Sequence, residues 1–285
     1  MSYQNITVVI TTFHSETKIV SCLRTINSEI NVVIIENSDN SQFKEKIEKN
    51  FANVKCHLAG ENLGYAKGNN LGLSKVGTKF ALILNPDALL DSNAINNFLI
   101  TAKKNPDFSI IGPLVQEEFN AKEINDNPNP SIKETSSVKG FAMFFNMEQF
   151  KNVGFFDNEI FIYLEEIDLC KKIKKLGKKI FLDPSIKISH GGGSSHDQDI
   201  NYEMELSRNW HWMWSSFYFH KKHNSYHSAF IKFLPKLLSS FFKIIFYKIT
   251  FSKKNSLIYS QRFSGLYNAM LGKKSWYRPK ITQIN

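Results

Sequence analysis

Short apolar runs alternate with segments of helical periodicity along the first part of the chain. The runs, rich in valine and isoleucine, predict strands at residues 6–12, 31–37, 53–59 and 79–85. Apolar residues at helical spacing lie between them and predict helices at residues 15–27, 42–51 and 65–76. Strands that are apolar on both faces and alternate with helices are typical of a mostly parallel sheet covered on both sides. The pattern therefore predicts an α/β fold.

Polar residues follow three of these predicted strands. Thr11 and Thr12 end the first, Glu36 ends the second, and Asn85 and Asp87 flank a proline after the fourth. Each group is also ordinary turn chemistry, because turns commonly use Asn, Asp, Ser and Pro. Parallel sheets, however, bind ligands at the carboxyl ends of their strands. Three polar ends at one edge favour a binding site there.

Glycines recur at intervals of four in the third predicted helix. Gly64, Gly68 and Gly72 share one helix face, and the asparagines Asn62 and Asn70 lie beside them in sequence. Each glycine costs a helix about 1 kcal/mol relative to alanine, so a close contact is expected on this face. A ligand or a tightly packed strand would both provide it. The segment matches neither the Walker nor the Rossmann glycine pattern.

Three acids, Glu165, Glu166 and Asp168, open a further predicted helix that ends at Gly177. Acids in a first turn often stabilise the helix dipole, by about 0.3 to 1 kcal/mol each. Mutual repulsion and burial would also raise their pKa values toward the range useful to a general base. On a helix Glu165 lies about 60° from Asp168 and about 100° from Glu166, so the three cannot all serve one atom.

His190 precedes three consecutive glycines. The pattern H-G-G-G forms an oxyanion loop in some esterases, but the chain has no G-x-S-x-G nucleophile elbow, which excludes that chemistry. A structural histidine beside a glycine turn remains a possible interpretation, because histidine often fills a polar pocket.

Charge divides the chain into two parts. The net charge of the 285 residues is +10, yet all 26 acidic residues precede position 206 and fourteen of the 36 cationic residues follow it. We therefore predict a mildly acidic domain at residues 1–205 and a basic, aromatic, helical region at residues 206–285, with separate partners. The three cysteines match no metal spacing, and a strand pattern begins almost at once, so we expect a cytoplasmic protein with reduced thiols.

Residues 229–251 form an apolar helical pattern that lysines and Pro235 interrupt. No uninterrupted apolar run is long enough to span a bilayer. Lys232, Lys236 and Lys243 fall within about 40° of one another on a helix, beside Phe and Leu, as in helices that lie on an anionic membrane surface. We expect peripheral contact with the inner face of the cell membrane. A helical pair packed on the domain at residues 1–205, or a dimer contact, is the alternative.

Two other segments carry less information. The tryptophans of residues 210–214 are suited to stacking on a sugar, to a bilayer interface or to a core. Residues 115–137 are polar and contain two prolines, which predicts a mobile loop, either an acceptor-binding lid or a surface insertion.

The ordered motifs resemble family 2 glycosyltransferases, in particular the rhamnosyltransferase-like branch. The resemblance covers roughly residues 5–220 and rests on ITVVITTF, VVIIENSDN, ENLGYAKGNNLGL, LILNPDALL, FDNEIFIYLEEIDLCKKIKKLGKKI and ISHGGGSS. It implies the GT-A nucleotide-diphospho-sugar transferase fold. It also implies transfer of a sugar, with rhamnose as a candidate, to a hydroxyl of a glycan or lipid-linked glycan in surface polysaccharide synthesis.

The resemblance implies roles for individual residues. A divalent cation, Mg²⁺ or Mn²⁺, would bind the donor diphosphate through Asp87 and His190. Glu166 would deprotonate the acceptor hydroxyl, with Glu165 and Asp168 as alternatives, and the displacement would invert the anomeric carbon. The residues implied at the nucleotide-diphospho-sugar donor are Thr11, Thr12, Glu36, Asn62, Gly64, Asn70 and Asn85.

Three positions depart from the family pattern. Asn85-Pro86-Asp87 replaces the usual D-x-D, and both Glu166 and Glu36 stand where aspartate is common. The extra methylene of Glu166 alters its reach by about 1.5 Å. Glu36 leaves the choice of nucleotide base open.

Two other classes of function fit parts of the sequence. A sugar-phosphate nucleotidyltransferase would share the sheet edge and the metal carboxylate, but it would carry a glycine-rich phosphate loop that residues 11–18 lack. A non-catalytic nucleic-acid or membrane-binding protein would explain the basic tail. It would leave the acidic and histidine motifs without use, so we expect no nucleic-acid partner.

Overall fold

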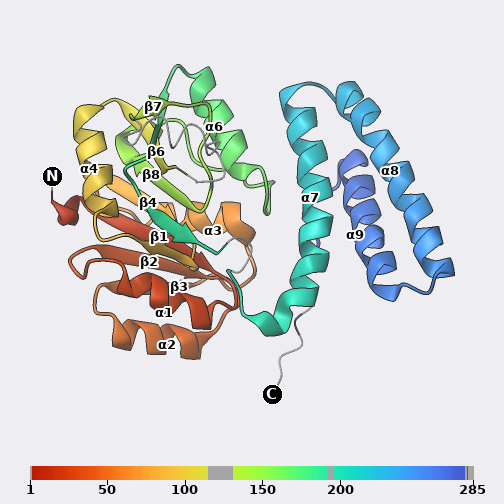
Figure 1. Cartoon of the computed structure of the whole chain (residues 1–285), viewed down its shortest axis with the longest axis horizontal. Coiled ribbons are helices and arrows are strands. Elements are labelled where there is room, and N and C mark those ends of the chain that lie inside the picture. The colour runs from red at the N-terminus through yellow and green to blue at the C-terminus, as the bar shows by residue number, and fades with distance from the viewer. Residues whose placement is uncertain (1, 115–130, 192–194, 280, 282–285) are drawn as a thin grey trace. The chain divides into compact units, whose positions relative to one another are not determined.

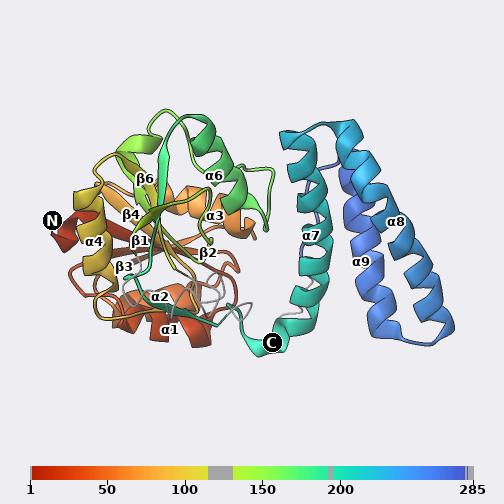
Figure 2. The same ribbon diagram turned by 45° about the horizontal axis from the view of Figure 1, so that its top comes forward.

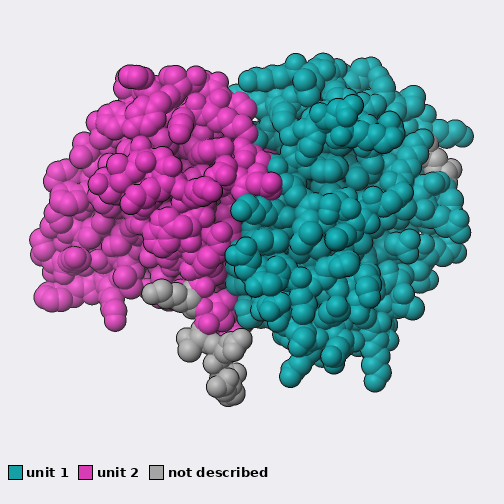
Figure 3. Space-filling view, turned by 180° about the vertical axis from the view of Figure 1, so that it is seen from behind, with its two compact units in different colours: residues 1–156, 166–197 teal, residues 157–165, 198–285 magenta. Residues whose placement is uncertain are grey.

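The computed structural model describes residues 2–114, 131–191, 195–279 and 281 (Figure 1). The chain divides into two compact units, coloured separately in Figure 3. The first unit comprises residues 1–156 and 166–197, and the second comprises residues 157–165 and 198–285. The structural division thus follows Asp197, and the second unit includes a segment from the middle of the sequence.

The first unit is built on an eight-stranded sheet in the order β3-β2-β1-β4-β8-β6-β9-β7. The strands are β1 (Ile6–Thr12), β2 (Asn31–Glu36), β3 (Val54–Leu58), β4 (Phe80–Leu84), β6 (Phe108–Pro113), β7 (Lys133–Glu134), β8 (Ala142–Asn146) and β9 (Lys179–Asp183). The first four are mutually parallel, as their position in the sequence pattern predicts. β8 is antiparallel to both β4 and β6 and joins the two halves.

Helices cover both faces of this sheet (Figures 1 and 2). α1 (Glu16–Arg24), α2 (Ser41–Asn50) and α4 (Ala94–Lys104) pack on one face, against Ile6, Val8 and Ile10 of β1. α3 (Gly64–Leu73) and α6 (Glu165–Lys175) pack on the other, against Val9 of β1 and Ile83 of β4. Because alternate residues of each strand enter opposite cores, the strands are apolar on both faces.

A second, two-stranded sheet consists of β5 (Ala88–Leu90) and β10 (Ile188–His190), which pair antiparallel. The single-turn helices η1 (Tyr3–Asn5) and η3 (Met147–Phe150) belong to the same unit. The predicted loop at residues 115–137 lies mostly outside the described residues. Its last part carries β7, which pairs antiparallel with β9.

The second unit is a bundle of three helices preceded by η4 (Gln198–Ile200). α7 (Asn201–His223), α8 (Tyr226–Ile249) and α9 (Lys253–Met270) enclose a core that includes Trp210, Trp214 and Phe217. Two of the clustered tryptophans are therefore core residues, whereas Trp212 is 45% exposed. A β-carbon on Gly265 would lie 2.2 Å from the Trp210 carbonyl oxygen, so α7 and α9 approach closely only because this residue is glycine.

Residues 157–165 belong to this bundle through specific contacts. The Ser215 hydroxyl donates to the Ile162 carbonyl oxygen at 2.8 Å, and the Phe161 ring stacks on His211 at 4.4 Å. The Arg278 guanidinium lies 3.9 Å above the Phe161 ring. Complete burial lowers the pKa of His211 to about 3, so this imidazole is neutral and its Nε2 lies 2.9 Å from the Tyr277 carbonyl oxygen.

None of the described helices combines the length and the apolar character needed to cross a bilayer. This result agrees with the lysines and Pro235 that interrupt the apolar pattern, although Pro235 lies within α8 and does not end it.

Candidate active site

The pairing of β5 with β10 brings together two residues that are far apart in sequence. β4 ends at Leu84, and the turn that follows is closed by the Ala88 amide, which donates to the Asn85 carbonyl oxygen at 3.1 Å. The register of the pair sets His190 opposite Ala88. His190 Nε2 consequently lies 3.4 Å from Asp87 Oδ1. A cation bound by both Asp87 and His190, as the sequence predicts, requires the two side chains to lie this close.

Hydrogen bonds and a ring contact orient the pair. The Ser195 hydroxyl donates to Asp87 Oδ1 at 2.6 Å, and the Asn85 side-chain amide lies 3.2 Å from His190 Nε2. The Phe141 ring stacks on the imidazole at a centroid distance of 4.5 Å. Burial raises the pKa of Asp87, but the neighbouring His190, the hydrogen bond from Ser195 and a backbone hydrogen bond together lower that pKa below its usual value. The carboxylate is therefore ionised at neutral pH.

The donor set fits a divalent cation held jointly with a ligand. Octahedral Mg²⁺ ligands about 2.1 Å from the ion lie about 3 Å from one another, close to the separation of Asp87 Oδ1 and His190 Nε2. Mg²⁺ usually keeps several waters and binds through one or two carboxylates plus substrate phosphates. Among the described residues no group of three His, Cys, Asp or Glu side chains is placed to hold a metal ion. Asp87 and His190 would thus supply only part of the coordination sphere.

The loop between β1 and α1 is tied to the chain that follows β10. The Ser15 hydroxyl donates to the Ser195 carbonyl oxygen at 2.6 Å, and the Asp197 amide donates to the His14 carbonyl oxygen at 2.7 Å. The Thr17 amide donates to Asp197 Oδ1 at 3.3 Å. These contacts hold Ser195 beside Asp87. Ser195 could not be predicted from the sequence, because nothing in its local pattern links it to the end of β4.

The segment that precedes β8, at Gly140 and Phe141, lies close to both Glu166 and His190. The Asn85 amide donates to the Phe141 carbonyl oxygen at 2.9 Å, and the Tyr65 hydroxyl donates to the Gly140 carbonyl oxygen. A β-carbon on Gly140 would lie 3.6 Å from the Glu166 β-carbon. The same short segment therefore stacks Phe141 on His190 and passes close to Glu166 at Gly140.

The three acids of α6 differ in accessibility. Glu165 is 5% exposed and Asp168 is 2% exposed, whereas Glu166 is only partly buried. Burial raises the pKa of Glu166, opposed by backbone amides at the start of α6 and by the charge of Lys139. Glu166 thus combines partial exposure with a raised pKa, two properties that suit a general base.

Glu36 has a structural task in this molecule. Its Oε1 accepts from the Ser38 amide at 2.9 Å, and its Oε2 accepts from the Asn40 amide at 2.7 Å. The Ser38 hydroxyl also donates to Glu36. The carboxylate thus organises the turn between β2 and α2, and any bond from a nucleotide would have to use its remaining lone pairs. The neighbouring Thr12 is buried, and its hydroxyl lies 3.4 Å from the Ile35 carbonyl oxygen.

The glycines of α3 allow close packing on the sheet. A β-carbon would lie 2.6 Å from Thr11 Cγ2 at Gly68 and 2.3 Å from Val9 Cγ1 at Gly72. The sequence left open whether a ligand or a strand contacts this face of the helix. In the structure, β1 packs against Gly68 and Gly72. Gly64 instead adopts a φ of +73° at the start of the helix, a conformation that favours glycine.

The asparagines near α3 also hold the backbone. Asn62 Oδ1 accepts from the Gly64 amide at 3.0 Å. Asn70 Nδ2 donates to the Phe156 carbonyl oxygen at 2.9 Å, and its Oδ1 accepts from the Phe156 amide at 3.0 Å. Both ends of the Asn70 amide thus hold Phe156, and any bond to a donor would have to use its second N–H or its remaining lone pair. The sequence contained no signal for this long-range pairing.

Comparison with known families matches residues 7–170 to the model described as Glycosyl transferase family 2. The chain belongs to this family. The matched residues include Asp87 and Glu166 and end before His190 and before helices α7, α8 and α9. Membership of the glycosyltransferase family decides against the nucleotidyltransferase alternative.

Three curated relatives are glycosyltransferases of low identity. The low-salt glycan biosynthesis hexosyltransferase Agl10 of Haloferax volcanii is 23% identical over 194 residues, covering 60% of this chain and 62% of the relative. The dTDP-rhamnosyl transferase RfbF of Shigella flexneri is 25% identical, covering 66% of this chain and 70% of the relative. The N-acetylglucosaminyl-diphospho-decaprenol L-rhamnosyltransferase of Mycobacterium tuberculosis is 21% identical, covering 60% and 69%. The chain therefore spans less than two thirds of the length of Agl10.

Solved structures share the GT-A fold of this family 2 member. The mannosyltransferase PcManGT from Pyrobaculum calidifontis, in complex with GDP-Man and Mn²⁺, superposes with a TM-score of 0.60 at 12% identity. That match covers 95% of this chain and 88% of PcManGT. GalNAc-T7 with UDP, GalNAc and Mn²⁺ gives a TM-score of 0.55 at 14% identity, covering 82% of this chain and 57% of that protein.

Proposed function

We propose that this chain is a metal-dependent, inverting glycosyltransferase that moves a sugar from a nucleotide-diphospho-sugar to a hydroxyl of a glycan or lipid-linked glycan. The observation that carries the proposal is the pair of facing atoms, Asp87 Oδ1 and His190 Nε2, 3.4 Å apart. Glu166 supports it, because its pKa is raised and it packs on the segment that also contacts His190.

Asp87 and His190 would hold Mg²⁺ or Mn²⁺ on the donor diphosphate. When bound, such an ion supplies a Lewis acid that offsets the negative charge developing on the leaving nucleoside diphosphate. Asp87 contributes an anionic oxygen, which its lowered pKa keeps ionised. His190 contributes an imidazole nitrogen, and the stacked Phe141 ring fixes the plane of that imidazole.

Glu166 would act on the acceptor. Its carboxylate accepts the proton of the acceptor hydroxyl while that oxygen attacks the anomeric carbon opposite the leaving diphosphate, which inverts the carbon. Burial raises the pKa of Glu166 and so strengthens it as a base. The Gly140 backbone beside it leaves room that a larger residue would fill.

The names of the relatives guide the choice of substrates. Two relatives are named as rhamnosyltransferases, and one of these names a diphospho-decaprenol acceptor. We therefore propose rhamnose as the first donor sugar to assay and a lipid-linked glycan of a surface polysaccharide as the acceptor. The enzyme would then work at the inner face of the cell membrane.

Sugar transfer by single-site variants of the α6 acids tests the assignment of the base. Glu166→Gln should lower transfer by about 10²- to 10⁴-fold, since the acceptor would lose its proton acceptor. Donor binding, measured as Mn²⁺-dependent thermal stabilisation by nucleotide sugars, should persist. Glu165→Gln and Asp168→Asn should retain most activity once their melting temperatures are matched, and the exposed Glu159→Gln serves as a control.

Two results would overturn the proposal. Near-normal transfer by Glu166→Gln, alongside a larger loss in Glu165→Gln or Asp168→Asn, would move the role of base to a neighbour. A product that keeps the anomeric configuration of the donor would exclude single displacement.

A further inference from the structure

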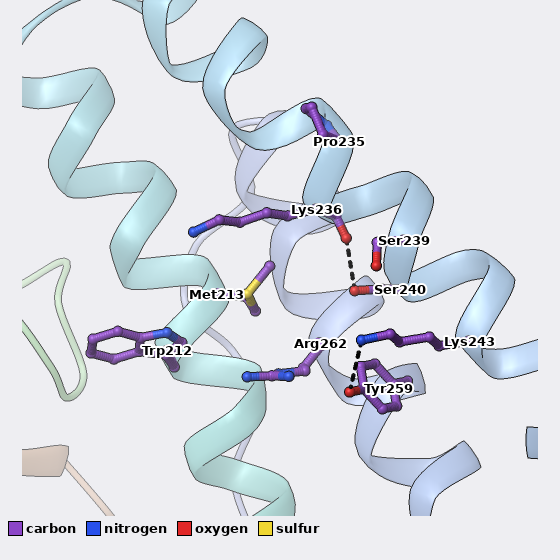
Figure 4. Close-up of a pocket in the computed structure, with 9 residues that line it drawn as sticks. All are labelled: Trp212, Met213, Pro235, Lys236, Ser239, Ser240, Lys243, Tyr259 and Arg262. Atoms are coloured by element: carbon purple, nitrogen blue, oxygen red, sulfur yellow. Dashed lines mark hydrogen bonds between the residues drawn. The ribbon is translucent and has the colours of Figure 1, made fainter.

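A pocket of about 330 Å³ lies within the second unit, between α7, α8 and α9 (Figure 4). Three cationic side chains line it: Lys236 and Lys243 from α8, and Arg262 from α9. Figure 4 shows Lys236 and Lys243 extending from α8 into the space between the helices, with Tyr259 beside Lys243. None of the residues assigned to the candidate active site lines this pocket.

The cations of this pocket have aromatic neighbours, and none of the described residues that line the pocket is acidic. Lys243 Nζ lies 3.2 Å from the Tyr259 hydroxyl and 4.8 Å above its ring, and the Arg262 guanidinium lies 5.5 Å from the same ring. Lys236 Nζ lies 4.9 Å from the Phe233 ring. Within the described part of the chain, no carboxylate forms an ion pair with any of the three. The three cations repel one another, and a bound anion would offset this repulsion.

Arg262 gives a second, independent indication of a ligand. Its Nε is buried, yet it has no hydrogen-bond partner among the described residues. A buried donor without an acceptor is unfavourable, and guanidinium groups bind phosphate oxygens with paired hydrogen bonds. Ser240, which also lines the pocket, is 4% exposed and hydrogen-bonds only within its own helix, to the Lys236 carbonyl oxygen.

The outer face of α8 is apolar along most of its length. Six large apolar side chains on this face are between 42% and 73% exposed: Ile231, Leu238, Phe242, Ile245, Phe246 and Ile249. At 100° per residue these six lie within about 60° of a common direction. The face spans residues 231–249, about 27 Å at 1.5 Å per residue. Exposed apolar surface of this extent marks a contact with a protein or a membrane.

The pocket opens beside this apolar face. On the helical projection, Lys232, Lys236 and Lys243 lie about 100° to 140° from the centre of the apolar face, between it and the side buried in the bundle. A helix lying in a membrane interface has this distribution, with acyl chains against one face and lysines reaching the phosphate level. Charge complementarity therefore favours a phosphate-bearing lipid as the occupant over an acidic protein.

We propose that the pocket of Lys236, Lys243 and Arg262 binds the diphosphate of a membrane lipid, while the apolar face of α8 lies in the adjoining acyl boundary. Three cations in one pocket match a group that carries more than one negative charge better than a phosphodiester. This inference rests on the proposed function for the identity of the lipid as the lipid-linked acceptor. It makes the second unit the acceptor-binding part of the enzyme.

Vesicle sedimentation without donor or metal tests this proposal. Neutral phosphatidylcholine vesicles would carry either a few per cent of a polyprenyl diphosphate or enough phosphatidylglycerol to give the same total charge. Wild type should bind the diphosphate vesicles more tightly. Lys243→Gln with Arg262→Gln should reduce that binding roughly ten-fold or more, because each cation near a membrane surface contributes to attraction.

Matched variants separate the pocket from charge in general. Lys248→Gln with Lys253→Gln also removes one cation from each of α8 and α9, but neither residue lines the pocket, so this variant should keep the preference for diphosphate. Lys236→Gln is a milder pocket variant, since Lys236 is exposed and its Nζ lies 4.9 Å from the Phe233 ring. It should weaken diphosphate binding without lowering the melting temperature. Phe242→Ser with Ile245→Ser should weaken binding to both kinds of vesicle.

Three outcomes would overturn the inference. Equal binding to the two kinds of vesicle would remove the diphosphate preference, and equal losses in the pocket and control pairs would reduce the pocket to unspecific charge. Wild-type binding by Phe242→Ser with Ile245→Ser would exclude α8 as the membrane contact. Asp87→Ala should bind vesicles like wild type, so a failure of the catalytic proposal remains distinguishable from a failure of this one.

Discussion

The two units differ in what their surfaces leave exposed. Among the described residues, the larger first unit has three exposed large apolar side chains, Leu89, Ile100 and Leu176, whereas the second unit has sixteen. In the first unit the polar groups at the sheet edge bond to one another, as Asp87 does with Ser195. In the second unit, Lys236, Lys243 and Arg262 of the pocket have no carboxylate partner among the described residues. The first unit thus holds a site organised by its own bonds, while the second presents surface that suits an external partner.

The largest expected effect comes from glycine substitutions, which test whether the two units unfold independently. Gly265→Ala should lower the free energy of unfolding of the helical unit by about 3 kcal/mol, because its β-carbon would meet the Trp210 carbonyl oxygen at 2.2 Å. Gly72→Ala should cost the first unit about 1 kcal/mol, since it meets the side chain of Val9, which can shift more easily than backbone. Denaturation followed by tryptophan fluorescence reports on the second unit, which contains all four tryptophans.

Donor binding provides the control for this pair of variants. Gly265→Ala should retain metal-dependent nucleotide binding by the first unit, and Gly72→Ala should retain the fluorescence transition of the bundle. A common loss of both signals in either variant would show that the units fold as one and would end the comparison.

Mild acid should also separate the two units, with a smaller effect. The pKa of His211 falls to about 3 in the folded bundle, against about 6.5 in an unfolded chain, so only the unfolded chain binds this proton near pH 6. Stability is therefore complete above about pH 6.5 and declines as the pH falls toward 3. Between pH 7.5 and 5.5 the bundle should lose about 1.4 kcal/mol of unfolding free energy.

A His211→Gln variant serves as the control, because glutamine keeps a hydrogen-bonding side chain but does not titrate. Guanidinium melts at the two pH values would measure the difference. A wild-type bundle that loses no more stability than His211→Gln would show that burial does not keep this imidazole neutral.

Local pattern predicted the parallel half of the sheet. The predicted strand at residues 79–85 corresponds to β4 at Phe80–Leu84, and the predicted helix at 42–51 corresponds to α2 at Ser41–Asn50. These elements carry continuous apolar runs or helical spacing, which are local properties. β8 and β10 were not predicted, because their antiparallel partners lie far away in sequence and only the folded chain selects them.

The candidate site likewise combines residues that the local pattern predicts with contacts that only the folded chain creates. The carboxylate of Asp87 and the imidazole of His190 are visible as residue types at a strand end and a glycine turn, and the fold brings them together. The bonds that occupy Glu36 and Asn70 depend on tertiary placement, so the sequence could not reveal them. The roles of Ser195 and Phe141 also depend on tertiary placement and could not be predicted. The same holds for the three helices of the second unit, where the sequence pattern defined only the helix at residues 229–251.

The central claim is that Asp87 and His190 together bind the cation that holds the donor diphosphate. Isothermal titration of Mn²⁺ in the presence of a non-transferable nucleotide-diphospho-sugar analogue tests it most directly, with Asp87→Ala, His190→Ala and the exposed control Asp107→Ala. We expect both site variants to lose at least ten-fold in Mn²⁺ affinity while Asp107→Ala binds like wild type. Wild-type affinity in either Asp87→Ala or His190→Ala would contradict the account.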